Sequence, residues 1–214
     1  MEIKRRTQTE RSAATRGALV AAARQLWSER GYAAVGTPEI AAAAGVTRGA
    51  MYHQFADKAA LFLAVAEAVE TDVTTRLGEY VVASGATDPA AALHAAVDGW
   101  LEACEEPEVR QVLLLDGPVV LGWDGFRDMA LRHGLGLTEA MLRAAIDAGQ
   151  LAEQPTRALA HVFIGSLDEA AMYVATSGDR AAARDEVAAV LHALLDGLVT
   201  SPEGRSLRRP EGET

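Results

Sequence analysis

The sequence is poor in the residues that build disulfides, metal centres and membrane spans. It has one cysteine, Cys104, among 214 residues, which excludes an internal disulfide and fits a reducing compartment. The five histidines include no pair at the i, i+4 spacing of helical metal ligands, and Cys104 has no neighbouring Cys or His. No uncharged apolar run approaches the roughly 18 residues that a membrane span requires. We therefore expect a cytoplasmic protein with no metal, no cofactor and no membrane partner.

Aromatic residues are also scarce, at 5%, although hydrophobic residues make up 50% of the chain. Alanine, the best helix former, supplies much of this apolar content, and β-branched residues do not recur with a period of two. Residues 119–123 form the one short apolar run that resembles a buried strand, but it would have no second strand to pair with. The composition predicts an all-α fold of about nine helices.

The patterns of common enzyme sites are missing. The sequence holds no nucleophile elbow, and Gly134-Leu135-Gly136 begins like a dinucleotide fingerprint but lacks the third glycine and a preceding strand. The acidic pairs at 105–106 and 168–169 are adjacent in sequence, which is typical of a solvated helix face. We expect no enzyme activity. The alternative, an all-α enzyme or small-molecule-binding protein without DNA binding, predicts a neutral or acidic first domain.

The charge is distributed unevenly along the chain. The net charge is −10, yet residues 1–60 hold nine Lys or Arg against five Asp or Glu, which gives +4. The remaining residues hold eleven Lys or Arg against twenty-five Asp or Glu, which gives −14. A basic end on an acidic body favours a nucleic-acid partner that docks at the amino-terminal end only.

Residues 37–55, TPEIAAAAGVTRGAMYHQF, predict two short helices joined by a tight turn. Thr37 can cap the first helix, Pro38 suits its first turn, and Gly45 can adopt the left-handed conformation of the turn. Thr47 then caps the second helix. Apolar residues at i, i+4 spacing on both helices share one small core. This is a helix-turn-helix, whose second helix enters the DNA major groove.

These residues resemble the DNA-binding domain of the tetracycline-repressor (TetR) family, with similarity that extends over residues 12–63. The resemblance is carried by a spaced series across three helices: Glu29-Arg30-Gly31-Tyr32, Thr37, Ile40 to Ala44, Gly45-Val46, Met51-Tyr52, Phe55 and Lys58. His53-Gln54 departs from the family, many members of which have an aromatic residue followed by His. The resemblance implies a regulator that a small-molecule effector releases from DNA. One recognition helix gives too little specificity, so we expect a homodimer on a pseudo-palindromic DNA operator. We expect repression because nothing in the sequence resembles a surface that recruits a polymerase.

We predict the DNA contacts from the positions of polar groups at the helix starts. Arg48 offers two parallel donors to guanine, Ala50 can touch a thymine methyl group, and His53 is exposed on the same helix. Hydroxyls, amines and backbone N–H groups near helix starts suit phosphate oxygens. The predicted DNA-binding residues are Thr37, Thr47, Arg48, Gly49, Ala50, Tyr52, His53 and Lys58.

We divide the chain into five parts: a disordered basic arm over 1–10, the helix-turn-helix domain over 11–56, a connecting helix over 57–84, a helical effector-binding and dimerisation domain over 85–200, and a polar tail over 201–214. Asp57, Asp88 with Pro89, and Asp179 are expected to start helices. A helix over 124–148 is expected to be loosened at Gly134 and Gly136.

The predictions of an effector pocket and of a dimer interface depend on the family resemblance more than on the spacing of residues. Large side chains with polar tips suit an apolar pocket: Trp100, Asp116, Trp123, Phe126, Met129, His133 and His161. The family resemblance implies that the last two helices pair into a four-helix bundle between subunits, with candidate residues Gly165, Asp168, Met172, Val187, Leu191 and Leu194.

Overall fold

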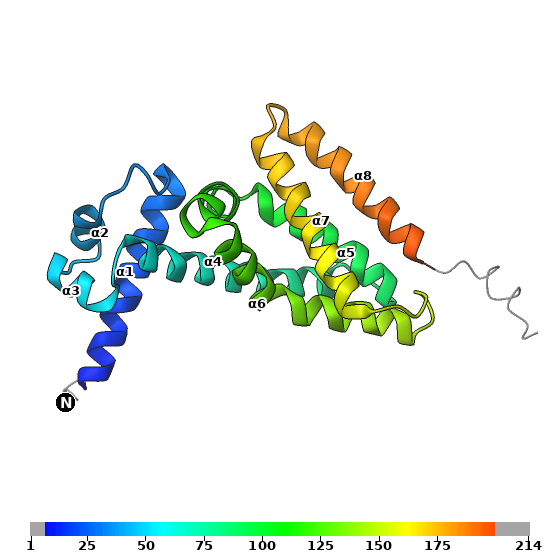
Figure 1. Cartoon of the computed structure of the whole chain (residues 1–214), viewed down its shortest axis with the longest axis horizontal. Coiled ribbons are helices and arrows are strands. Elements are labelled where there is room, and N and C mark those ends of the chain that lie inside the picture. Colours follow the sequence, from blue (N-terminus) through cyan, green and yellow to red (C-terminus); the bar gives the residue numbers. More distant parts are fainter. Residues whose placement is uncertain (1–6, 200–214) are drawn as a thin grey trace, which may run out of the picture. The chain divides into compact units, whose positions relative to one another are not determined.

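The computed structural model describes residues 7–199, which form eight α-helices and one π-helix and contain no strand (Figure 1). The predicted all-α fold is confirmed. The elements are α1 (Gln8–Arg30), α2 (Thr37–Ala43), α3 (Arg48–Gln54), α4 (Lys58–Ala83), α5 (Pro89–Glu105), η1 (Val109–Asp116), α6 (Gly117–Asp147), α7 (Thr156–Thr176) and α8 (Arg180–Leu198). Within the described part, none of these helices is both long and apolar enough to traverse a lipid bilayer.

The chain forms two compact units. Unit 1 comprises the described residues up to Asp72 together with residues 104–129, and unit 2 comprises residues 73–103 and the described residues from Ala130 onward. Unit 1 therefore contains α1, α2, α3 and η1, whereas α7 and α8 belong to unit 2. The helices α4 and α6 each contribute residues to both units.

Helix α1 begins earlier than the sequence predicts. The predicted disordered arm over 1–10 is wrong for residues 8–10, which form the first turn of α1. Thr7 and Glu10 make a capping box: the Thr7 N–H donates to Glu10 Oε2 at 2.7 Å, and the Glu10 N–H donates to Thr7 Oγ1 at 3.2 Å. Two backbone donors that a helix start would otherwise leave unpaired are thus satisfied. Residues 1–6 of the predicted arm lie outside the described residues.

The core of unit 1 is built around Trp27. This side chain is fully buried, and its ring lies 5.4 Å from the rings of Tyr32 and Phe62. Tyr32 and Phe62 are 5.2 Å apart and nearly perpendicular, an edge-to-face geometry that aromatic pairs favour. Gly31 ends α1 with φ +78°, a conformation that suits glycine, and its N–H donates to the Trp27 carbonyl. The chain therefore turns sharply after α1 while Tyr32 returns to the core.

Three predicted helix starts are confirmed by carboxylate caps. Asp57 accepts from the Ala60 N–H at 2.7 Å, Asp88 accepts from the Ala91 N–H at 2.9 Å, and Asp179 accepts from the Ala182 N–H at 3.1 Å. The bond from the Ala91 N–H is the largest cause that lowers the pKa of Asp88. Each cap satisfies a backbone donor in the first turn of the helix that follows.

The middle of the chain differs from the prediction in two places. Residues 109–116 form the π-helix η1, and α6 starts at Gly117, before the predicted start at residue 124, with Pro118 in its first turn, where proline is tolerated. The break in α6 falls at Gly122, with φ +70° and ψ +166°, and not at Gly134 and Gly136 as predicted. Gly122 adopts a backbone conformation that other residues rarely adopt, whereas the two later glycines remain within the helix.

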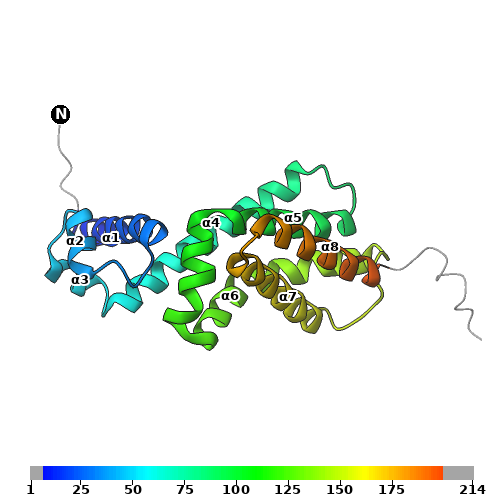
Figure 2. The same cartoon turned by 90° about the horizontal axis from the view of Figure 1, so that it is seen from above.

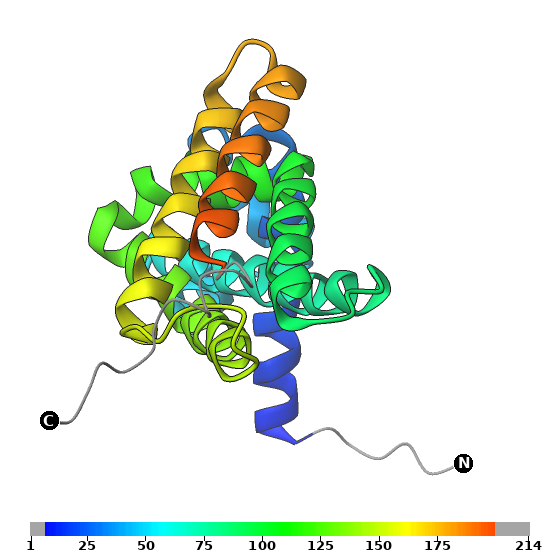
Figure 3. The same ribbon diagram turned by 90° about the vertical axis from the view of Figure 1, so that its right-hand side faces the viewer.

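The core of unit 2 joins α5, α6, α7 and α8. Helices α7 and α8 lie side by side as a helical hairpin (Figures 1 and 3), because only three residues separate them. Gly99 gives α5 a close approach to α4, since a Cβ there would lie 2.9 Å from side-chain atoms of Leu77 and Tyr80. Buried apolar side chains fill this core: Leu93, Val97, Leu101, Leu142, Ile146, Leu151, Ala160, Phe163, Leu191 and Leu195.

A polar array of side chains joins α5 and α8, the two helices of unit 2 whose ribbons are drawn in Figure 2. His94 and His192 bring their Nδ1 atoms within 2.7 Å, so one Nδ1–H donates a hydrogen bond and the other Nδ1 accepts it. Each ring then meets a carboxylate of the other helix: His192 Nε2 lies 2.8 Å from Asp98 and His94 Nε2 lies 3.3 Å from Asp196. Four side chains thus tie the two helices together.

We expect His192→Ala to lower the free energy of unfolding by about 1 to 2 kcal/mol, because it removes two hydrogen bonds and leaves His94 and Asp98 without these partners. Urea unfolding followed by far-UV circular dichroism measures this loss. His53→Ala, at an exposed position of α3, is the matched control and should leave stability unchanged. Equal unfolding free energies for both variants would contradict this role of the array.

Candidate nucleic-acid interface

The turn between α2 and α3 is closed by backbone hydrogen bonds. Gly45, with φ +67°, donates to the Ala42 carbonyl at 3.1 Å, and the Val46 N–H donates to the Ala41 carbonyl at 2.9 Å. The Ala50 N–H donates to Thr47 Oγ1 at 3.1 Å, so Thr47 caps α3 as predicted. Both helices pack on α1. The helix-turn-helix predicted for residues 37–55 is therefore present.

Helix α3 has one buried and one exposed face. Met51 is fully buried and Phe55, which follows the helix, is almost so. Arg48, Tyr52 and His53 are exposed. Of the other predicted DNA contacts, Thr47 and Gly49 are exposed and Ala50 is half-buried. Of the side chains predicted to read base edges, Arg48 and His53 thus lie on the surface of α3, and Ala50 is partly accessible.

Thr37 and Tyr52 connect α2 to α3. The N-cap of α2 is Gly36, and Thr37, expected to be the cap, is instead the first residue of the helix. Its hydroxyl lies 3.3 Å from the Tyr52 hydroxyl, and the Arg48 guanidinium lies 5.5 Å from the centre of the Tyr52 ring. The hydrogen bond with Thr37, and next the neighbouring Arg48, lower the pKa of Tyr52.

Lys58 at the start of α4 has partners within unit 1. Its ammonium donates to the Tyr32 carbonyl at 2.6 Å and lies 3.8 Å from the centre of the Tyr32 ring. Burial is the main cause that lowers its pKa, although Asp116 acts in the opposite sense. An ammonium has three donors. The bond to Tyr32 leaves two N–H groups for the predicted phosphate contact.

Contacts that the sequence did not predict hold α1 to later elements of unit 1. Arg24 donates to both oxygens of Glu108, at 2.6 and 2.7 Å, and to Asp72 at 2.5 Å. The hydrogen bond with Glu108 is the main cause that raises the pKa of Arg24. Near the end of α1, the Tyr32 N–H donates to Asp116 at 2.8 Å. No local pattern marks these pairs, because their members lie 48 and 84 residues apart.

The seven predicted effector residues are divided between the units: Asp116, Trp123, Phe126 and Met129 lie in unit 1, and Trp100, His133 and His161 lie in unit 2. Asp116 accepts from the Tyr32 N–H and from Gln111, while Trp100 donates to the Leu167 carbonyl at 3.2 Å. Phe126 and Met129 are buried, Trp123 is 62% exposed, and His133 and His161 are half-buried. Their role in effector binding stays a prediction.

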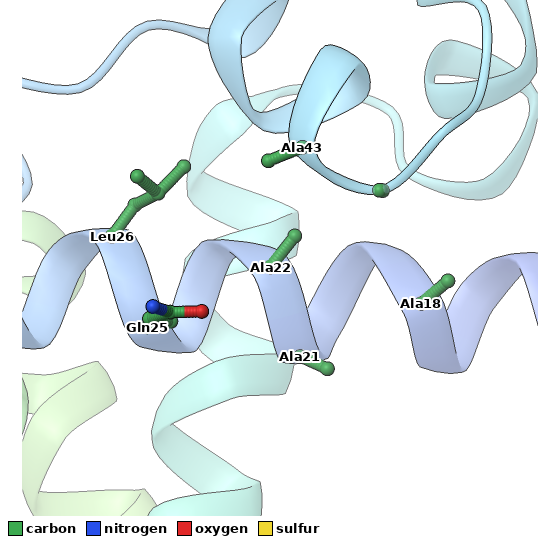
Figure 4. Close-up of a pocket in the computed structure, with 7 residues that line it drawn as sticks. Ala18, Ala21, Ala22, Gln25, Leu26 and Ala43 are labelled. Carbon is green, nitrogen blue, oxygen red and sulfur yellow. The ribbon is translucent and has the colours of Figure 1, made fainter.

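Two open hollows of the surface are lined by other residues. One in unit 1 lies between α1 and α2 and has a volume of about 430 Å³ (Figure 4). It is lined by the amide side chain of Gln25 and by apolar side chains: Ala18, Ala21, Ala22, Leu26, Ala43 and Ala44. A second, of about 560 Å³ in unit 2, includes Glu139, Arg143 and Arg157. Neither lining includes a predicted effector residue.

The predicted dimer residues on α7 and α8 differ in exposure. Leu194 is 55% exposed, whereas Leu191 and Asp168 are buried within their own chain. Gly165, Met172 and Val187 are half-buried. Exposed apolar side chains that the prediction did not include are Val162 and Val190, at 70% and 59%, and Tyr173 at 49%.

The geometry of α2 and α3 is that of a helix-turn-helix DNA-binding protein. Comparison with known protein families shows to which family of such proteins the chain belongs. A family model described as "Bacterial regulatory proteins, tetR family" matches residues 19–65. A second, described as "Tetracyclin repressor-like, C-terminal domain", matches residues 90–198. The chain belongs to the TetR family of bacterial transcriptional regulators. The function class predicted from the sequence is confirmed.

Individual relatives are transcriptional regulators. The chain is 31% identical over 194 residues to the HTH-type transcriptional regulator AcrR of Shigella flexneri, covering 85% of this chain and 89% of AcrR. It is 45% identical over 76 residues to the regulator CymR of Pseudomonas putida, covering 36% of this chain and 37% of CymR, so that likeness concerns about a third of each protein. A TetR-family regulator (ECA1819) from Pectobacterium atrosepticum has a similar crystal structure, with TM-score 0.82 and 36% identity over 92% of this chain and all of that chain.

We expect Arg24→Met to lower the free energy of unfolding by about 1 to 3 kcal/mol, because it removes charge-assisted hydrogen bonds to Glu108 and Asp72 and leaves both carboxylates without this partner. Thermal unfolding at fixed pH and salt measures the change. Arg180→Met, on an exposed residue of α8, provides the comparison. If the two variants unfold at the same temperature, Arg24 does not anchor α1.

Proposed function

We propose that the protein is a ligand-responsive repressor that binds a pseudo-palindromic operator as a homodimer and is released by a small-molecule effector. The observation that supports this most directly is the exposed face of α3, backed by buried Met51 and Phe55, in a chain of the TetR family. A DNA-bound regulator of this family would act in the bacterial cytoplasm, and we propose no enzyme activity for it.

The DNA contacts follow from where each group lies on α3 and its neighbours. Arg48, in the first turn, would donate two hydrogen bonds to guanine O6 and N7, and Ala50 would contact a thymine methyl group. His53 lies one turn further along. Thr37, Thr47, Tyr52, Lys58 and the backbone of Gly49 would bind phosphates and set the orientation of the helix without reading sequence.

The first test uses a duplex selected from a random-sequence pool by the natural protein. We expect Arg48→Ala to weaken binding to this duplex by about 1 to 3 kcal/mol, because a bidentate contact with guanine is lost. The preference should relax at one base pair of each half-site. Binding titrations with every base pair changed in turn measure both effects.

Arg157→Ala is the control for the first test, since it removes one exposed arginine from α7 in unit 2. It should bind the selected duplex as the natural protein does. Unchanged affinity and preference in Arg48→Ala would remove Arg48 from the base contacts.

The proposed dimer surface is a joint apolar face of α7 and α8. Val162 and Tyr173 are eleven residues apart, three helical turns, so they share one face of α7. Val190 and Leu194 are four apart and share one face of α8. The Tyr173 hydroxyl donates to Glu186 at 3.3 Å, and Glu186 lies one turn before Val190. The two exposed faces therefore lie side by side.

A face of this kind suits a second copy of the chain. Exposed apolar side chains gathered on one surface typically mark a protein interface. A two-fold dimer would bury this face against itself and would hold two copies of α3 for the two half-sites of an operator. Among the predicted dimer residues, Leu194 lies within this face, whereas Leu191 already packs in the core of its own chain.

We expect Val190→Glu to raise the dimer dissociation constant more than about tenfold, because an unpaired charge would be buried at a cost of about 2 kcal/mol or more. Sedimentation velocity over a dilution series measures the shift to monomer. Ala181→Glu adds the same charge at an exposed position in the first turn of α8 and should leave the dimer intact. A Val190→Glu protein that remains dimeric at the lowest concentration would place the interface elsewhere.

The effector would act on the contacts that hold α1 within unit 1. Arg24 binds Glu108 and the Tyr32 N–H binds Asp116, so α1 and the turn after it are attached to the residue before η1 and to the last residue of η1. A small-molecule effector that favours one arrangement of these contacts would change the affinity for DNA. Ligand binding and DNA binding would then be coupled in both directions, as linkage requires.

A further inference from the structure

Helix α3 has polar contacts on both sides of its buried stripe. At 3.6 residues per turn, Met51 and Phe55 lie in one line along the helix, with Tyr52 on one side of that line and Gln54 on the other. Tyr52 meets the Thr37 hydroxyl of α2 at 3.3 Å. The Gln54 side chain meets Ser12 of α1, with Gln54 Nε2 donating to Ser12 Oγ at 2.9 Å. The recognition helix is therefore tied to α2 on one side and to α1 on the other.

The contact with Ser12 belongs to a short stretch of α1 that faces the end of α3. Ser12 Oγ also lies 3.4 Å from Gln54 Oε1, so the hydroxyl and the amide have complementary donors and acceptors. One turn further along α1, the Arg16 guanidinium lies 4.3 Å from the centre of the Phe55 ring. Both Ser12 and Gln54 are half-buried, which strengthens the bond relative to a fully solvated one.

The buried stripe of Met51 and Phe55 does not by itself prevent rotation of α3. Two apolar side chains in a line set how deep a helix lies, but they resist rotation about that line only weakly, because hydrophobic contact is not directional. Hydrogen bonds are directional and weaken steeply away from a linear geometry. Polar contacts on both sides of the line therefore oppose rotation of α3 in either sense.

We propose that Ser12 and Gln54 are positioning residues for DNA recognition: their hydrogen bond sets the rotation of α3, and thus the direction in which Arg48 and Ala50 meet the base edges. The inference rests on the proposed DNA-binding function. In this assignment Gln54 acts through Ser12 and reads no base. Ser12, although it lies on α1, contributes to sequence preference as much as Gln54 does.

The experiment measures affinity for the duplex selected by the natural protein and for a duplex of unrelated sequence. We expect Ser12→Ala and Gln54→Ala each to weaken binding to the selected duplex by about 2- to 10-fold, the range expected for loss of one hydrogen bond. The double variant should lose no more than either single variant, because both remove the same bond. Affinity for the unrelated duplex should stay unchanged, since phosphate contacts dominate it.

Two further variants separate positioning from a general loss of structure. Ser12→Thr keeps the hydroxyl and should restore binding to the selected duplex. Ser28→Ala removes a serine hydroxyl from the same helix, where it donates to the Gln25 carbonyl, and should bind as the natural protein does. Circular dichroism at the binding temperature establishes that every variant is folded.

Three results would overturn the inference. Ser12→Ala could bind the selected duplex as tightly as the natural protein, which would make Gln54 a direct DNA contact or leave it without a role. The single losses could add in the double variant. The loss could be equal on both duplexes, as a purely structural role requires. Failure of the natural protein to select any duplex would instead refute the proposed function itself.

Discussion

The structure of the DNA-binding end depends on the burial of Met51 and Phe55 against α1. Helix α3 has only seven residues, and an isolated helix shorter than about 12 residues is marginal in water. Its stability must therefore come from its apolar stripe, from the Thr47 cap and from its contacts with α1 and α2. Because α1 contacts both short helices, any contact that holds α1 also supports the exposed face of α3.

The sequence predicted the parts of the fold that depend on neighbouring residues. Asp57, Asp88 and Asp179 cap helices as expected, since a carboxylate reaches backbone donors only three residues away. The helix-turn-helix was predictable for the same reason. The interruption of α6 was misplaced, because Gly122, Gly134 and Gly136 are equally permissive in sequence and only packing decides which of them leaves the helical conformation.

Contacts between residues far apart in the sequence could not be predicted from neighbouring residues. One set of these contacts, however, is marked by a repeated spacing in the sequence. Arg24 and Glu108 lie 84 residues apart, and nothing near either residue indicates the other. By contrast, His94 and Asp98 on α5 repeat the spacing of His192 and Asp196 on α8. Two histidines at this spacing indicate a metal site, whereas a histidine followed four residues later by an aspartate on each of two helices is the pattern that indicates this array.

Ion pairs of α1 show what some of the positive charges at the amino-terminal end of the chain do. Two arginines of α1 are paired with carboxylates, Arg24 with Glu108 and Asp72, and Arg30 with Glu39. Their charges are partly neutralised and serve the fold. Arg48 is exposed at the start of α3, where a cation interacts unfavourably with the positive end of the helix dipole. The Arg48 guanidinium is stabilised most when an anion binds it. Its position therefore agrees with a surface shaped for DNA more than for the stability of the isolated chain.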